Sequence, residues 1–63
     1  MYIHYDPEGD ILEIRFGKPT ASSFEKVYED VFERVDDKTN EITGYTIYNL
    51  KKRQNALELP ALV

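Results

Sequence analysis

The chain has 63 residues, a formal net charge of −4 and no cysteine. This length accommodates one small domain, 1–63, and excludes a second. Without cysteine there is no disulfide, no thiolate nucleophile and no thiolate metal ligand. The charge is uneven, because residues 1–50 carry five Lys/Arg and eleven Asp/Glu, whereas residues 51–63 carry three Lys/Arg and one Glu. An acidic body argues against nucleic acid binding by the isolated chain, since phosphate contacts require a basic surface.

The sequence predicts neither a signal peptide nor a membrane segment. Residues 1–10 lack a basic start followed by an apolar stretch. No apolar run approaches the ~20 residues that a membrane-spanning helix needs. We therefore expect a cytoplasmic protein that does not bind membranes.

The first residues predict a β-hairpin. Residues 1–5 are aromatic and β-branched, as strands favour, and residues 10–16 alternate between apolar and polar. The turn between them contains Gly9, which we expect to supply a positive φ. The apolar side chains expected on one face of the second strand are Leu12, Ile14 and Phe16.

Residues 22–36 are compatible with two structures. Their apolar side chains recur at helical spacing, which by itself slightly favours an amphipathic helix. Their many Val, Tyr and Phe residues favour a strand instead. A turn at 37–41 precedes the clearest strand, 42–49, and a strand after a hairpin turn needs an antiparallel partner, so we expect a strand at 30–36. The apolar residues at helical spacing are Phe24, Val27, Tyr28, Val31, Phe32 and Val35.

The predicted fold class is mainly β, with α+β as the alternative if 22–36 contains a helix. The predicted architecture is a four-stranded antiparallel meander, with strands at about 1–5, 10–16, 30–36 and 42–49. Residues 50–63 form a tail with an apolar end, which we expect to pack on the sheet or on a partner. Pro60 excludes a helix through this tail and permits only an edge strand.

Several short motifs occur together in an order that resembles a known family. Residues 5–14, YDPEGDILEI, are similar to the opening YDxxxDxLxI of the small prokaryotic family called domain of unknown function 2283. Residues 32–47 resemble its second block, a strand that ends in acidic residues, then a turn and GxxI, and residues 49–53 are similar to the stretch that follows. Asn40 stands where this family usually has Gly, and Asn is the next best residue for such a turn.

The resemblance implies a four-stranded antiparallel sheet with little helix, and so supports the strand at 30–36. It implies no established activity. Members resemble the antitoxin-type half of two-gene modules, encoded beside a small protein that resembles ribonuclease-type toxins. The resemblance therefore implies a small basic toxin-like partner.

No catalytic, cofactor or metal site is predicted, and we expect the chain not to be an enzyme. His4 is the single histidine, and no nucleophile or orienting carboxylate lies at a recognisable spacing from it. Asp6, Glu8 and Asp10 have the ligand chemistry of a hard-cation site, but we expect them to form a solvated hairpin turn. A metal-dependent enzyme is therefore the least favoured alternative.

Three groups of residues are candidates for binding a partner. The acidic group would complement a basic protein, the second group is a basic cluster, and the third is the apolar tail. We predict a protein-binding module whose partner is a small basic protein, or a second copy of the chain in a structural homodimer. The candidates are Glu29, Asp30 and Glu33; Lys51, Lys52 and Arg53; and Leu57, Leu59, Leu62 and Val63.

Overall fold

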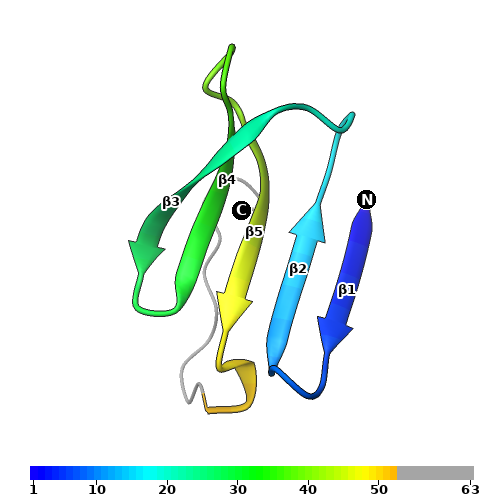
Figure 1. Ribbon diagram of the computed structural model, residues 1–63, viewed down its shortest axis with the longest axis vertical. Coiled ribbons are helices and arrows are strands. Elements are labelled where there is room, and N and C mark those ends of the chain that lie inside the picture. The colour runs from blue at the N-terminus through cyan, green and yellow to red at the C-terminus, as the bar shows by residue number, and fades with distance from the viewer. Residues whose placement is uncertain (53–63) are drawn as a thin grey trace.

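A computed structural model describes residues 1–52, which form five antiparallel strands and one turn of 3₁₀ helix. The strands are joined in one open sheet in the order β1-β2-β5-β4-β3 (Figure 1). The predicted mainly β class is confirmed. Among residues 1–52, no helix is long and apolar enough to cross a membrane. The elements are β1 (Tyr2–Asp6), β2 (Ile11–Arg15), β3 (Ser22–Tyr28), β4 (Val31–Asp36), β5 (Ile42–Tyr48) and the 3₁₀ helix η1 (Leu50–Lys52).

The predicted four-stranded meander needs two corrections. β3 is a fifth strand, within the segment 22–36 for which the sequence left helix and strand open. β2 pairs with β5 rather than with its successor in the chain, β3. Residues 16–21 therefore cross the end of the sheet to reach its far edge, where β3 lies against β4 (Figure 1). Strands β2 to β5 form a Greek key: hairpins link β3, β4 and β5, and a long connection joins β3 to β2, which lies beside β5.

The helical spacing within 22–36 is coincidental, because the hairpin of β3 and β4 divides these apolar residues between two faces. Val31 is fully buried and Val27 packs against the core, whereas Phe24 is 57% exposed. An irregularity in the pairing near Val27 shifts the register between the two strands. A period of 3.6 residues thus arises from two strands of period 2 that are offset by a bulge and a turn.

Positive φ angles at non-glycine residues form the turns. Asn40 has a φ of 62° in the β4–β5 turn, which confirms the prediction from its position, and Asp30 has a φ of 63° between β3 and β4. In the first hairpin the positive φ, 56°, belongs to Asp10 and not to Gly9 as predicted. Asp and Asn tolerate this conformation because their short polar side chains bond locally.

The core lies on one face of the sheet, which we call the core face. Its buried side chains come from the three central strands and are Ile14, Val31, Tyr45 and Ile47. Leu12 and Phe16 pack partly against them, so the predicted apolar face of β2 is confirmed. Direct antiparallel partners share a face, and the opposite face carries most of the remaining aromatic rings. We call it the aromatic face; its rings are Tyr2, His4, Phe24, Phe32 and Tyr48.

Candidate functional site

The two acidic candidates at the β3–β4 turn are mainly structural. Asp30 adopts the positive φ that closes the turn, and its carbonyl oxygen accepts a hydrogen bond from the Tyr48 amide at 2.8 Å. The Glu29 carboxylate lies 3.5 Å from the Lys26 ammonium. Both ends of this ion pair are largely exposed, so its contribution to stability is small.

Glu33 lies in a different environment, because its direct partner across the strand is also acidic. In the register of β3 and β4, Glu25 stands opposite Glu33. Side chains at such positions are about 5 Å apart at Cβ, and like charges there destabilise a sheet. Within residues 1–52 no basic group lies within 4.0 Å of either carboxylate. We call these two residues the glutamate pair.

The basic candidates begin in η1, at the end of the sheet where β5 stops. Lys51 and Lys52 are exposed there, and the Lys51 amide donates hydrogen bonds of 3.2 and 3.0 Å to the two carboxylate oxygens of Asp10. Arg53 and the four candidates of the apolar tail lie outside the described residues. The tail candidates are Leu57, Leu59, Leu62 and Val63.

Asp10 joins the first hairpin to η1. Its carboxylate accepts a hydrogen bond of 2.7 Å from the Tyr5 hydroxyl in addition to those from Lys51. The Tyr5 hydrogen bond holds the pKa of Asp10 below its usual range, and the same contact raises the pKa of Tyr5 to about 12. The predicted turn of solvated acids is thus more specific than expected, since two of the three carboxylates accept hydrogen bonds: Asp10 as described, and Asp6 from the Glu8 amide at 3.0 Å.

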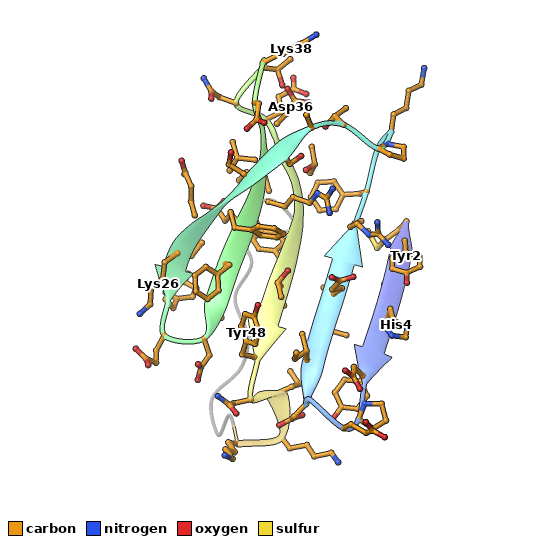
Figure 2. The ribbon with its side chains drawn as sticks, in the orientation of Figure 1. Tyr2, His4, Lys26, Asp36, Lys38 and Tyr48 are labelled. Atoms are coloured by element: carbon orange, nitrogen blue, oxygen red, sulfur yellow. The ribbon has the colours of Figure 1, made fainter. Side chains whose placement is uncertain are left out.

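Asp36 has the corresponding role at the other end of the sheet, beside Lys38 (Figure 2). Its carboxylate accepts hydrogen bonds of 2.8 Å from the amides of Lys38 and Thr39. The Thr20 hydroxyl and these amides lower the pKa of Asp36 to about 2. Because Thr20 belongs to the β2–β3 connection, Asp36 ties that connection to the β4–β5 turn.

Potential metal ligands are dispersed over the described chain. Within residues 1–52, no three His, Asp or Glu side chains gather around a point where a cation would bind. The His4 ring stacks on Tyr2 with 6.3 Å between ring centres (Figure 2).

One row of side chains crosses all five strands on the aromatic face. Tyr2 of β1 is the direct partner of Arg15 of β2, and Arg15 in turn stands opposite Gly44 of β5. On its other side Gly44 stands opposite Arg34 of β4, whose partner on β3 is Phe24. The guanidinium carbon of Arg15 lies 4.2 Å from the Tyr2 ring centre, and that of Arg34 lies 6.0 Å from the Phe24 ring centre. We call these five residues the arginine row.

A surface pocket of about 380 Å³ opens where the two arginines meet the β2–β3 connection. Arg15, Arg34 and Lys18 line it, whereas none of the Asp and Glu residues of the described chain does. Neither guanidinium has a carboxylate within 4.0 Å among residues 1–52. The Nε atom of Arg15 is buried without a hydrogen-bond partner. The pocket is therefore a positively charged site in an acidic protein.

Comparison with known families decides where the chain belongs. The sequence model of a family described as protein of unknown function (DUF2283) matches residues 2–51. The chain is a member of the DUF2283 family. No curated protein and no solved structure matches it. The resemblance noted from the sequence motifs is confirmed, and the matched segment of this DUF2283 chain contains all five strands and the arginine row.

Sequence reasoning missed the arginine row and Glu25. In the DUF2283 chain, Arg15 and Arg34 become neighbours of Gly44 only because β2 pairs with β5, and no local pattern indicates that pairing. Two weak signals were available. The alternation of 10–16 turns Arg15 away from the core, and a glycine inside the clearest strand marks a close approach of backbone.

Proposed function

We propose that this DUF2283 chain is a protein-binding module for a small basic partner, and that it acts as the antitoxin-type member of a pair with a ribonuclease-type toxin. The observation that carries this proposal is the glutamate pair. Two carboxylates placed directly opposite each other repel in the free protein. A lysine or arginine from a partner would remove that repulsion and replace it with attraction.

The position of the pair supports the same proposal. Glu25 lies on β3, an outer strand of the sheet whose outer backbone edge has no partner strand among residues 1–52. An extended segment of another protein binds such an edge through backbone hydrogen bonds. The net charge of −4 would accelerate the encounter with a basic protein, because long-range attraction mainly raises association rates.

The test is capture of the partner from the native host, followed by affinity measurement. We expect a small basic protein at a 1:1 ratio, with ribonuclease activity that the chain inhibits. Replacing both members of the pair (E25Q with E33Q) should weaken binding by about tenfold or more, or ~1.4 kcal/mol. E8Q with E41Q is the matched control, because it also removes two negative charges, from exposed residues in two other turns.

Two results would contradict the proposal. One is that no small basic protein is retained. The other is a captured protein that binds E25Q/E33Q and the control E8Q/E41Q with equal affinity, since the glutamate pair would then not lie in the interface.

Self-association through β1 is a second candidate function, that of a structural homodimer. β1 is the other outer strand, and its residue Ile3 is 62% exposed although it faces the same way as the buried Ile14. An exposed apolar edge strand is a surface on which a second copy can pair. Sedimentation should then show a dimer that Ile3→Lys converts to monomer, and a wild-type chain that remains monomeric at about 1 mM would exclude this function.

A further inference from the structure

The arginine row brings two cations together and leaves a gap between them. Arg15 and Arg34 stand on either side of Gly44, so their Cα atoms are two strand spacings, or about 10 Å, apart. A Cβ added at Gly44 would collide with the backbone carbonyl oxygen of Ile14. No side chain larger than hydrogen can therefore separate the two arginines without shifting the backbone.

The positive charge at this gap is not neutralised by the described chain. Seven Lys/Arg occur in residues 1–52 against eleven Asp/Glu, yet three of the seven line the pocket and none of the eleven does. The buried Nε atom of Arg15 has no hydrogen-bond partner. Leaving a buried donor unpaired costs free energy, and such a group in a native structure calls for an explanation. A bound anion would supply the missing negative charge at the gap.

The two arginines are also held in position. Tyr2 lies against the guanidinium of Arg15 and Phe24 lies near that of Arg34, so a ring at each edge of the sheet restricts each side chain. Arginine carries a planar fork of donors that matches phosphate and carboxylate oxygens. Lys18 adds a point charge from the β2–β3 connection. Cationic donors from three separate segments that line one pocket suit a tetrahedral group with several acceptor oxygens better than a planar carboxylate.

The size and walls of the pocket indicate more than an inorganic ion. Its volume of about 380 Å³ falls within the ~300–1,000 Å³ range of small-molecule sites. Besides the cations it is lined by Phe16, Pro19 and Tyr2, and 45% of the Tyr2 surface is exposed. We propose that the pocket binds a phosphorylated small molecule that carries a planar ring, of the size of a mononucleotide, with its phosphate between Arg15 and Arg34. This site is separate from the glutamate pair, so each proposal can fail without the other.

The experiment is a titration of the full chain with adenosine 5′-monophosphate as the probe, followed by calorimetry and by amide chemical shifts. We expect a dissociation constant below about 1 mM at low salt and shifts centred on Gly44 and Arg15. R34Q should weaken binding by about tenfold or more, because it removes a charge-assisted donor. K38Q, which removes the same charge from the exposed tip of the β4–β5 turn, should change the dissociation constant by less than about twofold.

A second variant protects the test against loss of folding in R34Q. K18Q alters an exposed side chain of the connection and should weaken binding several-fold with an unchanged amide spectrum elsewhere. Adenosine, which lacks the phosphate, should bind at least about tenfold more weakly than the probe.

Four outcomes would overturn the proposal. If the probe does not bind at concentrations up to about 10 mM, the pocket is not a binding site for such a molecule. Equal losses for R34Q and K38Q mean diffuse attraction and not a pocket. If inorganic phosphate binds as tightly as the probe, the ring contributes nothing to binding and is not part of the recognised ligand. A short single-stranded RNA that binds far more tightly than the probe, with contacts beyond the pocket, replaces the small molecule with a nucleic acid strand.

Discussion

Two aspartates join segments that are distant in the chain, and both use the side-chain carboxylate to do so. Asp10 joins β1 to η1 through Tyr5 and Lys51. Asp36 joins the β2–β3 connection to the β4–β5 turn through Thr20 and two turn amides. In each case hydrogen bonds to the charged form lower the pKa of the aspartate. The order of the turns therefore depends on ionised carboxylates.

Asp36→Asn should destabilise the protein at neutral pH, with a fall in Tm of about 5 °C, since the amide accepts more weakly from the turn. The pKa of Asp36 is about 2 in the folded protein and 3.8 when unperturbed. The stabilisation is therefore complete above pH ~4 and is lost as the pH falls toward ~2. Thermal unfolding of wild type and variant across this range should show the difference in Tm narrowing below pH ~4.

The control for this prediction is E41Q, which removes a carboxylate from the same turn region. It should leave Tm nearly unchanged at neutral pH. If the Tm of D36N stays below that of wild type by the same amount from pH 7 to pH 2, the shape of the side chain, and not its charge, accounts for the loss of stability.

At the scale of elements, the glutamate pair predicts that a substitution on β4 will stabilise the sheet. Glu33→Gln removes one of two charges that stand opposite each other. The free energy of unfolding should rise by ~0.5 kcal/mol at low salt, and the gain should shrink as salt screens the repulsion. Urea denaturation of wild type, E33Q and E41Q at two salt concentrations measures it. Equal stability of wild type and E33Q at low salt would mean that the two carboxylates do not interact.

The strands that could be predicted from the sequence are those with their own local signal. Alternation identified β2, and turn residues such as Asn40 identified the β4–β5 hairpin and hence β4. β3 was missed because a bulge near Val27 and a two-residue turn at Glu29 and Asp30 gave the hairpin a helical spacing of apolar residues. The residue types, rich in Val, Phe and Tyr, were the better guide in this segment.

Most of the candidate site could not be predicted, because it depends on which strands become neighbours. The glutamate pair requires the existence of β3, and the arginine row requires the pairing of β2 with β5. Neither relation is encoded by residues close in sequence. Glu33 was identified from an acidic run alone, whereas Arg15 and Arg34 belong to no run, and the local signals for their site were weak.

At the scale of the whole molecule, the buried core is confined to the middle of the sheet. Its four side chains belong to β2, β4 and β5, and β5 supplies two of them, Tyr45 and Ile47. The outer strands supply none of the buried apolar residues of the described chain. Local stability follows the density of buried contacts, so outer strands should open before the centre does.

Hydrogen exchange of the backbone amides tests this order. Among hydrogen-bonded amides, those of β5 should exchange most slowly and those of β1 and β3 faster by about a hundredfold or more. The measurement should be made by NMR at two protein concentrations, because self-association through β1 would slow its amides only in the concentrated sample. Amides of β1 that are as protected as those of β5 at every concentration would contradict the prediction. Such a result would mean that β1 opens only together with the core, although Ile3 and Tyr2 are largely exposed.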